Sequence, residues 1–419
     1  MIIRSILLSL LCLYPCFFTQ AQDIQQARKW IDTLASPYMF GRGYVNGGDR
    51  IAASYIANEF EHFGLKPLFP EKRFTQAFTH DVNTFGAEQF LRIGKTDLVP
   101  GKDYIIQPFS GSVKGKFKTE LVRAGNDGKW KTKKYKSNTA IILYASTPEE
   151  YKTLSAELKD AIRLTNLILL INPGKLTWSV ADYQIPGKTI IEVKQSAVAN
   201  VSDLKSVSVD CSAELKKSYE SLNVAAKLDG EIKDTFLIIS AHYDHLGKMG
   251  SALFAGASDN ASGTALMLDL AAYYAKTKKP KYSIIFIAFA AEEAGLVGSK
   301  YFVDNPPINL KRIRFVFNID LMGGGSIGAT VVNGSVFENE FLRLQELNTQ
   351  HNLLGRINKR GKAANSDHYW FSENGVPSFF MYAEGGVTAY HDVDDTRENL
   401  PLTQYNELYT LIRLFLDGF

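Results

Sequence analysis

The sequence predicts an α/β protein: a three-layer helix–sheet–helix sandwich with a mostly parallel mixed sheet, plus a smaller strand-rich inserted domain. Two observations predict this fold. Four short runs in the second half of the chain are apolar on both faces, as in strands that are covered on both sides: 236–241, 282–289, 313–319 and 376–382. Patterns with helical periodicity fall between these runs, and strands that alternate with helices are typical of such a sandwich.

Helices are expected in four places. Residues 48–64 carry apolar side chains near one face, with Gly64 at the end. Ser262 is in position to cap a helix in which Leu266, Leu270 and Tyr274 share a face. Residues 339–352 and 404–416 also have a helical pattern.

The amino-acid composition changes between the helix expected at residues 48–64 and the four apolar runs. Residues 84–217 are rich in Lys, Thr and Val and contain short apolar runs, such as 139–144 and 166–171, but no cluster of reactive side chains. We interpret 84–217 as an inserted domain with several short strands. Residues 22–83 and 218–419 then form one discontinuous principal domain.

Residues 1–21 are expected to be a secretory signal peptide. One positive charge precedes an apolar stretch from Ser5 to Phe18, and small residues follow it. The stretch is shorter than the ~20 residues of a membrane span, so we expect export to the periplasm or the cell exterior without stable membrane insertion. An uncleaved anchor and lipid attachment at Cys16 are the alternatives.

The composition is that of a folded, nearly neutral protein. The chain has 47 basic and 44 acidic side chains, a net charge of +3, and no basic tail or stripe that would indicate nucleic-acid binding. Without the signal peptide Cys211 is the one remaining cysteine, so the fold must rest on its core and not on an internal disulfide.

Side chains that bind metal ions follow the predicted strands. In an open α/β sheet, ligands bind beyond the carboxyl ends of the strands, and each apolar run here leads to an imidazole or a carboxylate. Each residue alone has an ordinary structural explanation, but their joint position favours a metal site. The set comprises His242, Asp244, Asp259, Glu292, Glu293, Asp320, Tyr390 and His391.

Two histidines and three carboxylates suit a pair of zinc ions with one shared carboxylate. The adjacent residues Glu292 and Glu293 can have different roles: one can bind metal while the other accepts a proton from water. Asp244 lies two residues after His242 and is placed to accept the far ring N–H of that histidine.

These residues lie in motifs that resemble those of the co-catalytic di-zinc exopeptidases, the family of bacterial leucine aminopeptidases, glutamate carboxypeptidase and the related glutaminyl cyclases. The resemblance covers about residues 23–67 and 223–419, and the inserted segment resembles a protease-associated domain in position and composition. The motifs are 241–247, 256–263, 288–299, 318–322, 366–368 and 390–396.

The resemblance implies a role for each residue. Asp259 is expected to bridge two zinc ions, with His242 and Asp320 on one ion and Glu293 and His391 on the other. Glu292 is expected to be the general base, Asp244 the partner of His242, and Tyr390 a donor to the oxyanion. The peptide bond between Asp259 and Asn260 is expected to be cis.

The sequence therefore predicts a zinc-dependent exopeptidase that acts on peptides, with an aminopeptidase as the working hypothesis. A glutaminyl cyclase with one zinc ion, a carboxypeptidase-type enzyme and a non-catalytic binding homologue are the alternatives. Oligomeric state, preferred side chain and native metal stay open, and no arginine cluster for acidic substrates is visible. No metal role is expected for His62, His80, His245, His351 or His368.

Residues 323–328 also match two unrelated patterns, the serine-hydrolase elbow and the dinucleotide fingerprint. Both patterns require a helix directly afterwards, whereas residues 329–333 form a β-type run. We therefore expect a loop there, and neither of those functions.

Overall fold

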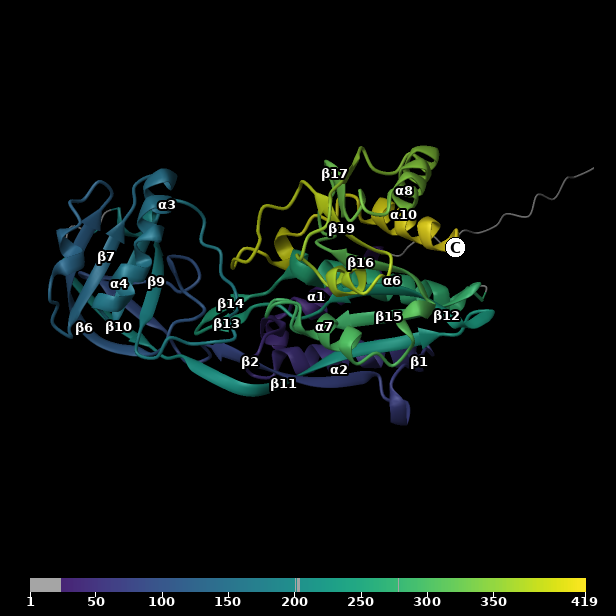
Figure 1. Cartoon of the computed structure of the whole chain (residues 1–419), viewed down its shortest axis with the longest axis horizontal. Helices are drawn as coiled ribbons and strands as arrows, with labels where there is room; N and C mark the ends of the chain where they lie inside the picture. The colour runs from purple at the N-terminus through teal and green to yellow at the C-terminus, as the bar shows by residue number, and fades with distance from the viewer. Residues whose placement is uncertain (1–23, 200, 202–203, 278) are drawn as a thin grey trace, which may run out of the picture.

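The computed structural model describes residues 24–199, 201, 204–277 and 279–419, so the predicted signal peptide lies outside the described residues. Figure 1 shows two bodies, each built around a sheet of its own. Among the described residues, no helix is long and apolar enough to cross a membrane.

The larger body contains a nine-stranded mixed sheet. Its central strands β15, β12, β16 and β19 are parallel, and antiparallel neighbours flank them. In spatial order the strands are β1 (Lys66–Pro67), β11 (Glu214–Leu228), β15 (Tyr282–Phe289), β12 (Ile232–His242), β16 (Ile313–Asp320), β19 (Ser378–Glu384), β17 (Gly328–Val332) and β18 (Ile357–Lys359), and β2 (Thr75–Thr84) also pairs with β11.

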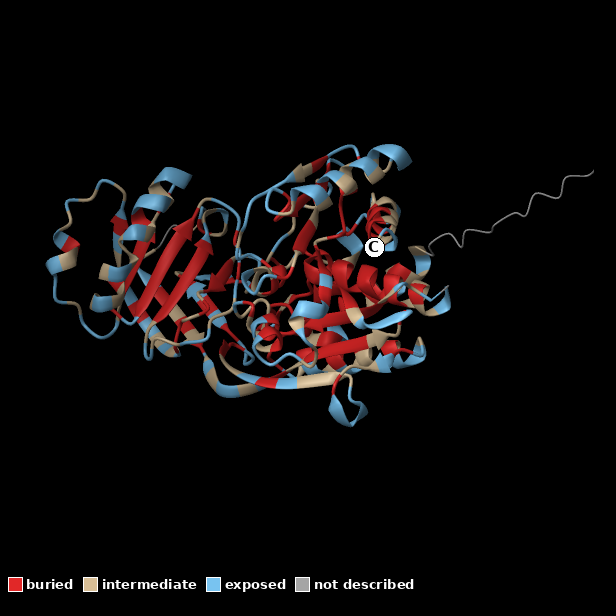
Figure 2. Ribbon diagram, turned by 45° about the vertical axis from the view of Figure 1, so that its right-hand side comes forward, coloured by how far each residue is buried: buried red, intermediate tan, exposed pale blue. Residues whose placement is uncertain are grey.

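Helices cover both faces of this sheet, and most residues of its central strands are buried (Figure 2). On β12, Leu237 and Ile239 belong to one core, whereas Phe236 and Ile238 belong to the other. The first core contains side chains of α1 (Ile24–Leu34), α2 (Gly48–His62), α6 (Gly263–Lys276), α8 (Glu338–His351) and α10 (Tyr405–Asp417), and the second those of α7 (Val297–Asp304) and α9 (His368–Glu373). The predicted three-layer sandwich is confirmed.

Ser262 does not cap α6, so that prediction is wrong. Residues Ala257–Ser262 form a π-helical turn that continues directly into the helix, and Ser262 itself has helical backbone angles. Its hydroxyl donates to the Ser258 carbonyl at 2.7 Å and accepts from the Met322 amide at 2.8 Å. The side chain therefore joins the turn to the segment after β16. The expected cis bond between Asp259 and Asn260 is present in this turn.

The smaller body contains an eight-stranded sheet. One face is covered by α3 (Pro148–Ala156) and α4 (Leu158–Leu164). The other face packs against a hairpin of the principal domain, β13 (Gly247–Met249) and β14 (Ala252–Phe254). In spatial order the strands are β4 (Thr96–Leu98), β3 (Phe90–Ile93), β10 (Ser206–Cys211), β6 (Val113–Arg123), β7 (Thr139–Tyr144), β8 (Leu167–Asn172), β9 (Thr189–Lys194) and β5 (Tyr104–Ile106), and α5 (Gln195–Val198) follows β9.

The expected limits of the inserted domain, residues 84 and 217, fall within an antiparallel ribbon of β2 and β11. In this ribbon Glu214 pairs with Thr84 and Val224 pairs with Thr75. The chain thus enters and leaves the insert through paired strands, which run between the two bodies in Figure 1. Residues 323–327 form a loop and Gly328 begins β17, so a strand follows where both competing patterns require a helix.

Asp49, near the start of α2, is a buried carboxylate whose ionisation opposes folding. Tyr219 Oη donates to it at 2.6 Å and Ser221 Oγ at 3.2 Å, yet burial raises its pKa to about 6. Because the folded state binds the proton of Asp49 more tightly than the unfolded chain does, protonation of Asp49 stabilises the fold at low pH. This stabilisation is lost as the pH rises through 6. The loss at neutral pH is about 3 kcal/mol.

We therefore expect Asp49→Asn to gain stability relative to the wild type as the pH rises. Between pH 4 and pH 8 the difference in the free energy of unfolding should shift by about 2.5 kcal/mol in favour of the variant. Urea unfolding of both proteins in the presence of a chelator measures this shift. A difference that is equal at the two pH values would contradict the assignment.

Candidate metal centre

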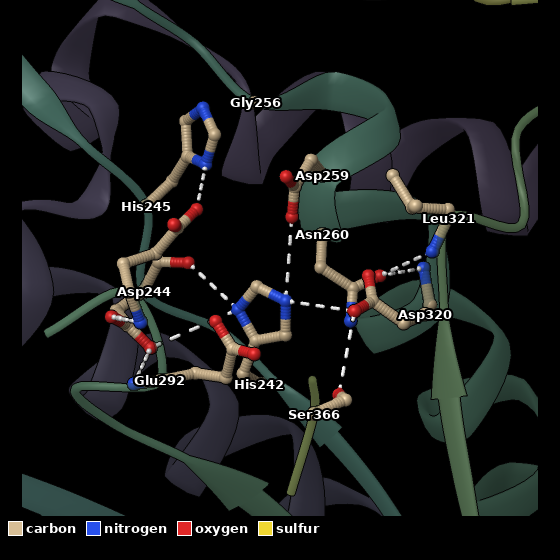
Figure 3. A network of polar contacts seen from close by, with 12 residues as sticks. His242, Asp244, His245, Gly256, Asp259, Asn260, Glu292, Asp320, Leu321 and Ser366 are labelled. Atoms are coloured by element: carbon tan, nitrogen blue, oxygen red, sulfur yellow. Dashed lines mark hydrogen bonds and ion pairs between the residues drawn. The ribbon is translucent and has the colours of Figure 1, made fainter. Parts of the chain in front are cut away.

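Five chain segments bring acidic and imidazole side chains together at the carboxyl edge of the parallel strands. Figure 3 shows the side chains of His242, Asp259, Glu292 and Asp320. His242 is the last residue of β12, and Asp320 is the last residue of the adjacent β16. Glu292 and Glu293 follow β15, the other neighbour of β12. Asp259 lies in the π-helical turn before α6, and His391 lies in the loop after β19.

The two predicted histidine ligands direct Nε2 at carboxylates. His242 Nε2 lies 3.3 Å from Asp259 Oδ1 and 3.3 Å from Asp320 Oδ2. His391 Nε2 lies 3.0 Å from Asp259 Oδ2 and 3.2 Å from Glu293 Oε2. The two oxygens of Asp259 therefore contact different histidines, as a carboxylate shared by two metal positions would.

The other ring nitrogen of each histidine contacts a backbone carbonyl. His242 Nδ1 lies 3.2 Å from the Asp244 carbonyl, and His391 Nδ1 lies 3.0 Å from the Trp178 carbonyl. Because a carbonyl only accepts, Nδ1 carries the hydrogen in both rings. In the neutral ring Nε2 then presents its lone pair to the centre of the cluster, which is the orientation of a metal-binding histidine.

The cluster attracts positive charge. Although burial disfavours the charged imidazole, the carboxylates of Asp320 and Glu292 raise the pKa of His242 well above its ordinary value. His391 is partly buried, which lowers its pKa, yet Glu293 and Asp259 raise the pKa to about 11. Imidazoles that hold protons this strongly mark a site where divalent cations would compete with protons.

The donor set fits divalent metal ions. The ligand atoms of one group lie within 4.8 Å of one another, and so do those of a second group. Within the described residues, Asp320 Oδ1 is buried without a hydrogen-bond partner, which is costly for a polar atom unless a cation satisfies it. Imidazole nitrogen and carboxylate oxygen are ordinary zinc ligands. The groups are His245, Asp259, Glu293 and His391, and His242, Glu292 and Asp320.

The adjacent glutamates have different environments. Glu293 Oε1 accepts from His245 Nδ1 at 2.7 Å, and its other oxygen is directed at His391. Among the described residues, none donates a hydrogen bond to the Glu292 carboxylate, which lines a cavity. Burial raises the pKa of Glu292 above its ordinary value, and Glu293 adds to the rise, whereas His242 opposes it. Glu292 is thus the carboxylate that is free to accept a proton.

Asp244 is close to His242, but the predicted acceptor is wrong. The ring donates to the Asp244 backbone carbonyl, whereas the carboxylate oxygen lies 3.8 Å away. The carboxylate instead accepts from Tyr44 Oη at 2.9 Å and from the amides of Glu292 and Glu293 at 3.1 and 3.3 Å. The segment after β12 has no regular secondary structure, and there the Asp244 backbone carbonyl, not the carboxylate, contacts the ring. Asp244 therefore connects the segment that follows β12 to the segment that follows β15.

Sequence analysis assigned no role to three residues that contact this cluster, although Ser366 and Asp395 lie within the motifs 366–368 and 390–396. His245, which was expected to have no metal role, contacts Glu293 and belongs to one of the two ligand groups. Asp395 accepts from the amides of Ser258 and Asp259 at 2.7 and 3.1 Å and so fixes the turn. Ser366 Oγ accepts from Asn318 and lies 3.5 Å from Asp320 Oδ2. The spacing of His245 from His242 is the one local signal for it. His62, His80, His351 and His368 belong to neither ligand group.

Arg42 is a fully buried cation beside the acidic residues. Its guanidinium donates to the backbone carbonyls of Tyr243, Ala255, Gly256 and Asp259 at 2.6 to 3.3 Å. Burial lowers its pKa to about 10, and nearby carboxylates oppose that effect. Arg42 therefore stays charged at neutral pH and joins the segments that carry His242 and Asp259. Nothing local in the sequence predicted this role.

The cluster opens into a cavity of about 200 Å³. Tyr390 lies at its wall, stacked on the His391 ring with 4.0 Å between ring centroids, and is 45% exposed. Arg360 also lines the cavity and donates to Tyr382 Oη at 3.1 Å. The lining comprises His242, Asp259, Glu292, Asp320, Leu321, Arg360, Asn365, Phe380, Tyr382, Tyr390 and His391.

Comparison with known protein families and protein sequences finds a matching family and several related proteins. The model of Peptidase family M28 matches residues 223–416. Aminopeptidase YwaD of Bacillus subtilis is 27% identical over 236 residues, which are 54% of this chain and 50% of that protein. An aminopeptidase of Pseudomonas aeruginosa is 32% identical over 121 residues, 29% of this chain and 22% of the relative. The matched part thus spans half or less of these relatives' own length.

Solved structures share the fold. BSAP, a zinc aminopeptidase from Bacillus subtilis, superposes with a TM-score of 0.69 at 19% identity, covering 94% of this chain and 93% of that one. An aminopeptidase from Aneurinibacillus sp. strain AM-1 gives 0.64 at 20% identity, with 95% and 93% covered. At this coverage the likeness extends over the inserted segment as well as the principal domain.

Proposed function

Because the chain carries a Peptidase family M28 domain over residues 223–416, we propose that it is a zinc aminopeptidase, which releases N-terminal residues from peptides. The observation that carries this proposal is the position of Asp259, with one oxygen against His242 and the other against His391. The aminopeptidase names of the relatives support the reaction class. The predicted signal peptide would deliver the activity outside the cytoplasm.

In this proposal the cluster holds two zinc ions. Asp259 would contribute one oxygen to each ion, His242 and Asp320 would bind one, and Glu293 and His391 would bind the other. The chemistry that zinc supplies in such a site is polarisation of a carbonyl group and a lowered pKa of water. The divided contacts of Asp259 support two positions, each with three protein ligands.

The chain's own residues perform the proton transfers. Glu292, with its unpaired carboxylate at the cavity wall, takes a proton from the attacking water and returns it to the leaving amine. Asp244 fixes the backbone amides of Glu292 and Glu293 and so holds both side chains in place. Tyr390 lines the same cavity and would donate to the oxygen that gains charge during the attack.

The cavity lining supports a preference for apolar N-terminal side chains. Leu321 and Phe380 provide apolar surface, whereas Arg360 is a permanent positive charge beside Tyr382. A substrate lysine would meet this charge, and a leucine would bury its side chain. We therefore expect kcat/KM to be higher for leucine than for lysine.

A panel of aminoacyl-anilides tests the proposed function. Leucyl-anilide should be hydrolysed, N-acetyl-leucyl-anilide should not, and a chelator should abolish the activity until zinc is restored. Activity confined to blocked peptides or to C-terminal residues would overturn the aminopeptidase assignment. Cyclisation of N-terminal glutamine by a protein with one zinc ion would favour the glutaminyl cyclase instead.

A further inference from the structure

Residues of the inserted domain hold the loop that carries His391. The Trp178 amide donates to the His391 carbonyl at 2.9 Å, and the Trp178 carbonyl lies 3.0 Å from His391 Nδ1. Lys175 Nζ donates to the Thr388 carbonyl at 2.9 Å and lies 2.5 Å from Asp392 Oδ2. The insert therefore contacts His391 itself and the loop on both sides of it.

These contacts give His391 what a metal-binding histidine requires. The hydrogen bond to Nδ1 fixes the ring so that Nε2 is directed at Asp259 and Glu293. His391 also has a φ of 54°, a left-handed conformation that is uncommon for a residue other than glycine. Such a conformation persists when surrounding contacts determine it, and the paired hydrogen bonds to Trp178 are such contacts.

Trp178 is itself fixed by packing between the two bodies. Its indole Nε1 donates to the Ile106 carbonyl of β5 at 2.7 Å, and the side chain is only 4% exposed. The ring stacks on Phe254 of the β13–β14 hairpin, with 4.6 Å between ring centroids. That hairpin is part of the segment that joins His242 to Asp259, so the insert contacts two segments that carry residues of the metal cluster.

We propose that the inserted domain completes the metal centre: Trp178 and Lys175 are positioning residues, and zinc binds tightly at Glu293 and His391 only while the insert holds the His391 loop. This inference rests on the proposed function and extends it. Loosening the contact between insert and loop should weaken one zinc site and leave the site at His242 and Asp320 intact.

Stepwise zinc binding in competition with a chromophoric chelator tests the proposal. Trp178→Ala frees the segment and should weaken binding of the second zinc ion by about 10- to 100-fold, and Lys175→Ala by about 10-fold. The first ion should bind as in the wild type, and Lys175→Arg should restore the second site. The visible spectrum of the cobalt-loaded protein should change for the second ion alone.

Lys114→Ala is the matched control, because Lys114 forms its 2.6 Å ion pair with Asp210 inside the insert. It should bind both ions as the wild type does. If Lys175→Ala also bound both ions with wild-type affinity, the proposal would be overturned. Lys175 is half-exposed, so this variant decides the question even if Trp178→Ala fails to fold. A wild-type protein that binds no zinc would instead overturn the proposed function.

Discussion

Glu292→Gln should lower kcat for leucyl-anilide by about 10²- to 10⁴-fold, the usual contribution of a general base, while both zinc ions stay bound. Glutamine has nearly the same shape as glutamate but cannot accept the proton of the attacking water. The ligand atoms of Glu292 lie within 4.8 Å of those of His242 and Asp320, so the carboxylate is also within reach of a metal ion. The experiment therefore has to separate a base from a ligand.

Zinc content measured on the same preparation makes that separation. Glu293 has both oxygens in contact with histidines, whereas the Glu292 carboxylate accepts no hydrogen bond from the described residues. Loss of one zinc ion from Glu292→Gln would identify Glu292 as a ligand. Full activity with two ions would show that the base lies elsewhere. Glu338→Gln is the control, since Glu338 is an exposed residue of α8 that pairs with Lys359.

The sheet and the gathering of the cluster could be predicted because both follow from local patterns. A short apolar run rich in β-branched and aromatic residues, such as 282–289, favours a strand that is covered on both faces, and β15 has these bounds. Parallel strands end at one edge, so residues at the ends of β12 and β16 must lie close together. The residue types at those ends then favour a metal site.

The orientation of individual groups could not be predicted in the same way. Asp244 follows His242 at a spacing that suggests a carboxylate–imidazole contact, but the backbone carbonyl of Asp244 makes that contact. Serine is a common residue at helix N-caps. Ser262, however, is the last residue of the π-helical turn that leads into α6, so it does not lie where the helical segment begins. Each outcome depends on a backbone path that residue types alone do not determine.

Contacts between distant segments were outside the reach of sequence patterns altogether. Trp178 and His391 are 213 positions apart, and Trp178 lies in a segment that shows no cluster of reactive side chains. Arg42, the last residue of a 3-10 helix (Pro37–Arg42), donates to carbonyls about 200 positions away. Trp178 and Arg42 form hydrogen bonds with polar groups that have no partner nearby in the sequence. The need for such a distant partner is visible only once the fold is known.

Asp259→Ala should remove both zinc ions, whereas Asp320→Ala should remove only the ion at His242. The two oxygens of Asp259 contact His242 and His391 separately, so alanine leaves each position with two of its three protein ligands. Catalytic zinc sites usually keep three. Zinc per chain after dialysis measures this difference. Thermal unfolding gives a second measure. Zinc at 100 times its Kd adds about 2.7 kcal/mol to the stability of the wild type and should add nothing to the stability of Asp259→Ala. An Asp259→Ala protein that keeps one tightly bound ion would show that the carboxylate belongs to a single site, and the two-ion arrangement would then have to be abandoned.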